Sequence, residues 1–147
     1  MQLAKNNDPV FIKFCEELDR VQDAIEPRRE FLGIRSVEGL DKVTDVLLLR
    51  DGKKFIGCIS TKPMSSDIMI ICRAYVDPRY RGKGLAGKLI DEIERIIAAR
   101  GAKTAVARIL NKNKASLRAF GKKGYVVDDS VSEEVCDIRV YVRKDLS

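Results

Sequence analysis

The chain has 147 residues, 45% of them hydrophobic and 34% charged, a balance typical of one globular domain and not of a disordered or fibrous protein. Its formal net charge of +6 favours anionic partners, such as nucleic acid, an acidic surface or a polyanionic cofactor. There is no histidine and the four cysteines lie far apart, which argues against zinc fingers, imidazole metal sites and histidine-based triads. We therefore expect no metal.

No segment approaches the ~20 apolar residues that span a membrane, and the first eight residues hold no apolar signal core. The cysteines each sit in an apolar run, which predicts buried, reduced thiols. We expect a soluble, cytoplasmic protein with a single domain, residues 1–147.

Helical patterns come first. Asp8-Pro9 suits a helix start, and apolar residues at helical spacing predict a helix over about Pro9 to Ala24. Beyond Pro27, the segment Arg28 to Gly33 predicts a second short helix or a turn.

Strands follow. Val43 to Arg50 and Lys54 to Ser60 flank Asp51-Gly52-Lys53 and predict a hairpin. The nearly unbroken apolar run Ile68 to Val76 predicts a central strand that is covered on both faces.

The second half of the chain predicts alternating elements. A long amphipathic helix should follow the glycines and end at Gly101, and the strand after it should lie parallel to the strand before it. Asn113 is a plausible N-cap for the next helix, and Gly124 its stop. The predicted elements after Gly101 are strand Thr104 to Leu110, helix Asn111 to Lys123, and strands Tyr125 to Asp128 and Val135 to Lys144. This order indicates an α+β fold with a mixed sheet.

The strand and the long helix are joined by a glycine-rich turn, Gly82 to Gly87, whose backbone N–H groups and helix dipole suit a phosphate. Gly82-x-Gly84-x-x-Gly87 matches the dinucleotide fingerprint, but five residues separate it from the strand. The next strand also ends without a ribose-binding carboxylate. The nucleotide-triphosphate loop motif does not occur.

The same turn, Arg81-Gly82-Lys83-Gly84-Leu85-Ala86, also fits Arg/Gln-x-x-Gly-x-Gly/Ala. It is preceded by Val76-Asp77-Pro78-x-Tyr80 and followed, after one strand, by Asn113-x-x-Ser116-x-x-x-Phe120-x-x-x-Gly124-Tyr125. In order and spacing these segments resemble the GNAT superfamily of N-acetyltransferases across about Val43 to Val127. The resemblance implies a mixed, mostly antiparallel central sheet that is splayed at an acyl-CoA cleft and flanked by helices.

The resemblance also implies where acetyl-CoA, the family's cosubstrate, binds. The N–H groups of the glycine turn would cradle the pyrophosphate, and Arg81 and Lys83 would add positive charge. The backbone of the preceding strand would bond pantetheine and polarise the acetyl carbonyl. The implied cofactor-binding residues are Ala74, Tyr75, Val76, Arg81, Gly82, Lys83, Gly84, Leu85, Ala86, Gly87, Asn113, Ser116 and Phe120.

At the position of the usual general acid, the sequence departs from the family's pattern. Many members use a tyrosine where this chain has Phe120, which cannot donate a proton. Ser116 and Tyr125 are the remaining candidates, although packing is the simpler role for Tyr125. A thiolate with a pKa near ~8.5 can also take its proton from water.

The general base is likewise unassigned. Many members carry a glutamate on the strand before the glycine turn, where this chain has Cys72 and Arg73. Glu133 and Glu134 are either replacements or surface carboxylates. If Arg73 faces the acceptor cleft, it would bind an acceptor that carries a carboxylate or phosphate.

The resemblance implies an N-acetyltransferase that moves an acetyl group from acetyl-CoA to a primary amine of a small molecule or protein, by direct attack in a ternary complex. The missing acid and base leave an alternative, an acyl-CoA-binding regulatory module with little catalysis. Only the net charge supports a nucleic-acid binder, so we expect neither nucleic acid nor membrane as a partner. Dimers are common in the family, which makes a homodimer one expected assembly.

Overall fold

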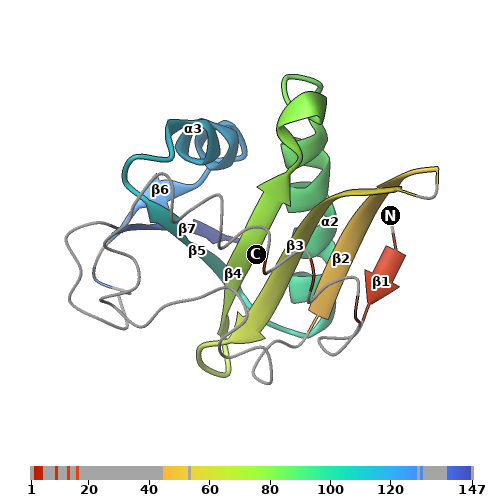
Figure 1. The fold of residues 1–147 in the computed structure, drawn as a ribbon. Coiled ribbons are helices and arrows are strands. Elements are labelled where there is room, and N and C mark those ends of the chain that lie inside the picture. Colours follow the sequence, from red (N-terminus) through yellow and green to blue (C-terminus); the bar gives the residue numbers. More distant parts are fainter. Residues whose placement is uncertain are drawn as a thin grey trace.

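The computed structural model describes residues 2–4, 9, 13, 16, 45–52, 54–128, 130 and 139–146. Within them, seven strands form one sheet in the order β1-β2-β3-β4-β5-β7-β6, and every neighbouring pair is antiparallel except β4 and β5 (Figure 1). The strands are β1 (Gln2–Ala4), β2 (Asp45–Asp51), β3 (Lys54–Pro63), β4 (Ile68–Val76), β5 (Thr104–Leu110), β6 (Val126–Val127) and β7 (Arg139–Asp145). The helices are the 3-10 helix η3 (Pro78–Tyr80) and the α-helices α2 (Leu85–Ala99) and α3 (Lys114–Lys122).

The predicted mixed sheet is confirmed, including the parallel pair. Ile68 to Ile71 of β4 pair with Thr104 to Ala107 of β5, and α2 forms the connection between the two strands. The predicted hairpin is also present as β2 and β3, with Gly52 in its turn at a φ of +60°.

Helix α2 buries one side against the sheet, on the face behind β2, β3 and β4 in Figure 1. Its buried residues, Leu89, Ile90, Ile93 and Ile97, pack with side chains from the sheet such as Ile59, Ile71 and Ala105. Gly101, at a φ of +86°, follows the end of the helix as predicted.

The central strand is covered on both faces, as its apolar run predicted. Met69 and Ile71 belong to the cluster that contains α2, whereas Ile70 packs with Val106 and Tyr141 in a second cluster. β7 is also buried on both faces, since Val142 belongs to the first cluster and Tyr141 to the second.

Several predicted bounds differ from the observed ones. β3 extends three residues beyond Ser60 to Pro63, because it remains paired with β4 up to Met69. β6 is only Val126–Val127, shorter than the predicted strand. β1 was not predicted, since three residues carry too little pattern to be recognised.

The N-terminal helix prediction lies mostly outside the described residues. Pro9, Lys13 and Glu16 are helical and exposed, which agrees with a polar face at these positions. The predicted short helix or turn from Arg28 to Gly33, and Cys15 and Cys136, are not among the described residues. Cys58 is buried as expected, whereas Cys72 is only half-buried.

We predict that Gly57→Ala destabilises the fold by about 1–3 kcal/mol, because a Cβ there would lie 2.8 Å from the backbone oxygen of Tyr75. Gly121→Ala in α3 is the matched control. Its Cβ would meet nothing within 4 Å, and alanine favours a helix by about 0.5–1 kcal/mol. Urea unfolding measures both changes. Equal midpoints for the two variants would contradict the close approach of β3 and β4 at Gly57.

Candidate functional site

The two central strands separate beyond their first four paired residues. Pairing between β4 and β5 ends at Ile71 and Ala107, although β4 continues to Val76 and β5 to Leu110. Figure 1 shows the two strands diverging toward the end where α3 lies. The predicted splay is therefore present, and it opens the sheet at its centre.

A β-bulge in β4 lies in the separated part. Cys58 pairs with Tyr75 and Ser60 with Cys72, so two residues of β4, Arg73 and Ala74, lie opposite the single residue Ile59. A bulge of this kind bends its strand and increases the local twist. It therefore contributes to the divergence of β4 from β5 and breaks the alternation of side chains along β4.

The glycine turn leads directly into α2. Gly82 and Gly84 have φ values of +80° and +77°, which favour glycine, and Gly84 is the N-cap of α2. A Cβ at either position would meet nothing within 4 Å, so no described side chain covers this backbone. The first turn of α2 contains no acidic residue and its N-cap makes no side-chain hydrogen bond. The turn thus has the geometry and charge of an anion cradle.

Three hydrogen bonds fix the segment before the turn. The backbone N–H of Asp77 donates to Ile56 O at 2.7 Å, and Tyr80 Oη donates to Asp51 Oδ2 in the β2–β3 hairpin at 2.9 Å. Arg81 Nε donates to Val76 O at 2.9 Å. The hydrogen bond to Asp51 raises the pKa of Tyr80, which keeps this tyrosine protonated as a donor. The turn is therefore tied both to β4 and to the hairpin.

Helix α3 begins on the other side of the opening. Asn113 Oδ1 accepts a hydrogen bond from the backbone N–H of Ser116 at 3.1 Å, so Asn113 is the N-cap that the sequence predicted. The residues at the start of α3 and those at the start of α2 line one cavity. Two helix N-termini, each with a partial positive charge, thus lie beside the same space.

The cavity has a volume of about 800 Å³. It is lined by β4 from the bulge onward, the glycine turn, the start of α2, and α3. Of the predicted cofactor-binding residues, it is lined by Ala74, Tyr75, Val76, Arg81, Gly82, Gly84, Leu85, Ala86, Gly87, Asn113, Ser116 and Phe120. Residues that the sequence placed in two separate motifs are therefore brought together.

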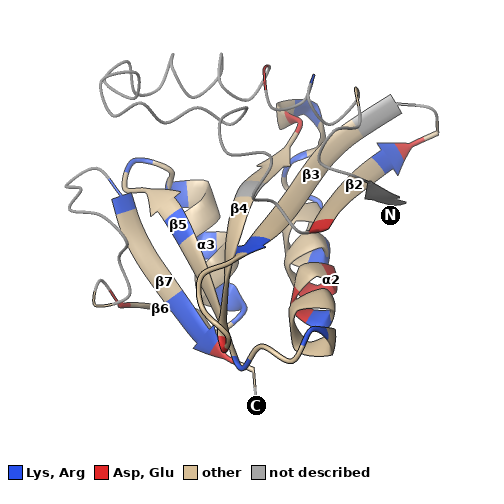
Figure 2. Cartoon of the chain, turned by 90° about the horizontal axis from the view of Figure 1, so that it is seen from below, with Lys and Arg blue, Asp and Glu red and all other residues tan. Residues whose placement is uncertain are grey.

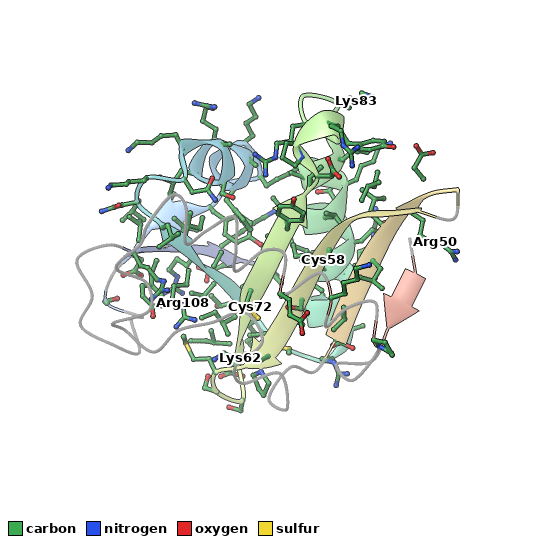
Figure 3. The ribbon with its side chains drawn as sticks, viewed as in Figure 1. Arg50, Cys58, Lys62, Cys72, Lys83 and Arg108 are labelled. Atoms are coloured by element: carbon green, nitrogen blue, oxygen red, sulfur yellow. The ribbon has the colours of Figure 1, made fainter. Side chains whose placement is uncertain are left out.

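Other predicted residues lie elsewhere. Lys83 does not line the cavity; its Nζ lies 5.4 Å from the ring centroid of Tyr80, and Figure 3 places it at the outer tip of the turn. The side chain of Arg73 and all of Glu133 and Glu134 are outside the described part of the chain. Cys72 does not line the cavity, and its Sγ lies 3.4 Å from Ser60 Oγ.

Most of the positive charge of the cavity was not predicted from the sequence. Besides Arg81, the lining contains Lys112, Lys114, Arg118, Lys122 and Lys123, and its described residues include no aspartate or glutamate. A signal for this charge was present in the sequence, because Lys114, Arg118 and Lys122 are spaced by four residues in a predicted helix that contains no Asp or Glu. Tyr80 lines the cavity as well, although the motif that contains it did not predict a contact with the cofactor.

Tyr125 packs against the core. It is buried, does not line the cavity, and its ring meets that of Phe120 edge to face at a centroid distance of 5.0 Å. Burial, and after it the negative charge of Glu94, raise the pKa of Tyr125 above its usual range. Among the described residues, none meets ordinary hydrogen-bond geometry with its hydroxyl. This environment supports the packing role and disfavours proton donation to a group in the cavity.

No group of three or more His, Cys, Asp or Glu side chains among the described residues is arranged to hold a metal ion. No helix in the described ranges is long and apolar enough to cross a membrane.

Comparison with known proteins decides the family. Residues 13–125 match the Acetyltransferase (GNAT) family. The chain belongs to this family. None of the curated proteins matches the sequence significantly.

Solved structures of GNAT proteins share the fold at low sequence identity. A Klebsiella pneumoniae protein named as a candidate acyl-CoA N-acyltransferase is 21% identical, with a TM-score of 0.82 over 99% of this chain and 96% of that one. The PaiA N-acetyltransferase from Thermoplasma acidophilum, in complex with coenzyme A, is 17% identical, with a TM-score of 0.70 over 99% of both chains. A GNAT acetyltransferase from Elizabethkingia anophelis with acetyl-CoA bound is 16% identical, with a TM-score of 0.65 over 82% of this chain and 85% of that one. At these identities the likeness shows the fold alone.

We predict that Tyr125→Phe leaves the free energy of unfolding unchanged to within about 1 kcal/mol, because the ring pair with Phe120 remains and the lost hydroxyl has no good partner. Tyr125→Ala should cost about 3–5 kcal/mol through the cavity that it leaves. Urea denaturation of the three proteins measures both effects. A large loss in the phenylalanine variant would reveal a buried hydrogen bond that contradicts the packing role.

Proposed function

We propose that this protein is a single-domain N-acetyltransferase, residues 1–147, that moves an acetyl group from acetyl-CoA to a primary amine of a small molecule or protein. The observation that carries the proposal is the shared cavity, which joins an uncovered glycine turn to the opening between β4 and β5. Its volume lies within the usual range for cofactor sites, about 300–1,000 Å³. Its lining combines cations at the mouth with apolar side chains such as Ile59 and Leu89 within.

The residues present suit a polyanionic thioester. The N–H groups from Gly82 to Gly87 and the guanidinium of Arg81 would hold the pyrophosphate, since both are donors that prefer anionic oxygens. The backbone of β4 from Ala74 to Val76 would bond the pantetheine arm in the opening, where β5 no longer pairs with it. Asn113 and Ser116 would contact the cofactor from α3.

Acetyl transfer to an amine needs a neutral nucleophile, a polarised carbonyl and a proton for the departing thiolate. Acetyl-CoA, when bound, supplies the activated acyl group as a thioester. A backbone N–H of Ala74, Tyr75 or Val76 would polarise the carbonyl, and the amine would attack directly in a ternary complex. Phe120 forms an apolar wall of the cavity in place of a tyrosine acid. We assign donation of the proton to the thiolate either to Ser116 or to water. Of the two candidate hydroxyls, Ser116 and Tyr125, only that of Ser116 belongs to a residue that lines the cavity.

A second function, an acyl-CoA-binding regulatory module with little catalysis, has one observation in its favour. The described lining of the cavity contains no carboxylate that could act as a base. It also has Phe120 at the position where many family members have a tyrosine as the acid. Binding of acetyl-CoA is common to both functions. Turnover distinguishes them.

We predict that acetyl-CoA raises the melting temperature of the protein and that NADH does not, because a ligand stabilises the folded state that binds it. Gly84→Ala should lose most of this shift, since its methyl group enters the cavity lining at the turn. Gly101→Ala is a matched control at the other end of α2. Both glycines have positive φ, +77° and +86°, and open space around the added Cβ, so both variants bear a similar strain of about 1–2 kcal/mol. A normal shift in Gly84→Ala would refute the assignment of the turn.

We further predict sustained, acceptor-dependent release of the CoA thiol when acetyl-CoA and the protein are mixed with a panel of primary amines. The panel should include polyamines, amino acids, aminoglycosides and peptides with free amino groups. Gly84→Ala serves as the inactive reference. If acetyl-CoA binds tightly but no amine accelerates thiol release, the regulatory module is the correct function.

A further inference from the structure

A row of three cations runs along one side of α3. Lys114, Arg118 and Lys122 are spaced by four residues, so they lie one above the other on the helix, and all three are exposed and line the cavity. We call these three residues the α3 stripe. Helix α3 carries Lys and Arg but no acidic residue (Figure 2). Among the described residues, none forms an ion pair with a member of the α3 stripe.

This arrangement is unfavourable for the helix by itself. Like charges four residues apart destabilise a helix by about 0.2–0.5 kcal/mol per pair, and a cation near the N-terminus opposes the helix dipole. The first turn of α3 has no acid to offset this charge. An anion bound to the stripe would offset the repulsion between its three cations and would interact favourably with the N-terminus of the helix.

Two other cations of the cavity lining are already engaged. Arg81 donates to Val76 O beside the glycine turn, and Lys123 Nζ lies 2.9 Å from Asp91 Oδ2 on α2. In the proposed function the turn and Arg81 hold the pyrophosphate. The α3 stripe is a second group of cations, at the exposed mouth of the same cavity.

The lining of the cavity indicates how CoA would lie in it, and thereby which of its anionic groups the stripe would meet. The inner end is formed by buried apolar residues, Ile59, Leu89, Ile90 and Phe120, and suits the pantetheine arm with its thioester. The nucleotide end of CoA must therefore emerge at the exposed mouth, beside α3. That end carries a phosphate monoester on its ribose, with nearly two negative charges at neutral pH and three acceptor oxygens.

We propose that the α3 stripe binds the ribose 3′-phosphate of CoA and makes the protein select CoA thioesters over thioesters that lack this phosphate. The proposal rests on the proposed use of acetyl-CoA and adds a specificity site to it. Arg118, at the middle of the stripe, supplies a planar fork that can bind two phosphate oxygens. Lys114 and Lys122 flank it with point charges.

The test compares CoA with 3′-dephospho-CoA by isothermal titration calorimetry on the full chain. The two compounds share the pantetheine arm and the pyrophosphate, so their affinity ratio isolates the 3′-phosphate. We expect 3′-dephospho-CoA to bind the unmodified protein about tenfold more weakly, the size of one good charge-assisted contact. Raising the salt concentration should reduce this ratio, because the contact is exposed to solvent.

The decisive measurement is a thermodynamic cycle, in which the affinities for CoA and 3′-dephospho-CoA are measured for both the unmodified protein and the variant Arg118→Gln/Lys122→Gln. The variant should lose affinity for CoA but not for 3′-dephospho-CoA, so the ratio should fall toward one. Lys103→Gln removes an exposed cation at the opposite end of α2 and should keep the tenfold ratio. Without ligand the double variant should melt at the same or a higher temperature, because like charges have been removed.

Several outcomes would overturn the proposal. Equal binding of the two compounds by the unmodified protein would refute it while leaving the proposed function intact. An unchanged ratio in the double variant would show that another group binds the phosphate. Failure of both compounds to bind would refute the proposed function together with this inference.

Discussion

The separation of β4 from β5 is the constraint on which the site depends. A strand that leaves its neighbour exposes backbone donors and acceptors, so the separation persists only if each strand is well held on its other side. That condition is met here: β4 pairs with β3 as far as Val76, and β5 pairs with β7 along its whole length from Thr104 to Leu110. Neither strand needs the other to stay in the sheet, and the opening between them can admit a ligand.

The bulge and Gly57 explain how β4 leaves its neighbour. Two residues of β4 lie opposite one of β3, which bends the strand. Close by, the backbone oxygen of Tyr75 lies 2.8 Å from the position that a Cβ on Gly57 would take. The end of β4 is then fixed by the hydrogen bonds of Asp77, Tyr80 and Arg81. The glycine turn therefore begins at a defined point, and α2 presents its N-terminus to the opening.

The sequence predicted those parts of the site that depend on local backbone chemistry. The glycines require positive φ, and Asn113 caps its own helix, so both could be recognised from short segments. The splay was predicted through family resemblance and not through strand patterns, since the bulge breaks the alternation at Arg73 and Ala74. Lys114, Arg118 and Lys122 could be taken for an ordinary solvated helix face, because only the tertiary structure shows that they line a cavity. The role of Tyr125 was likewise decided by burial, which no local pattern contains.

Two ion pairs connect α2 to the part of the structure on the other side of the opening. Glu94 on α2 accepts two hydrogen bonds from Lys144 on β7, at 2.7 and 3.1 Å, and Asp91 on α2 pairs with Lys123 after α3. Helix α2 packs on the β3–β4 side, whereas β7 belongs to the β5 side, so the first pair joins the two halves that the splay separates. The Glu94 side chain is only 12% exposed and Lys144 also lies over the ring of Tyr125, so this pair is less screened than a surface one. Because Tyr125 in turn packs on Phe120, the same contact also supports the inner wall of the cavity. The cavity is thus supported in part by Glu94 and Lys144, neither of which lines it.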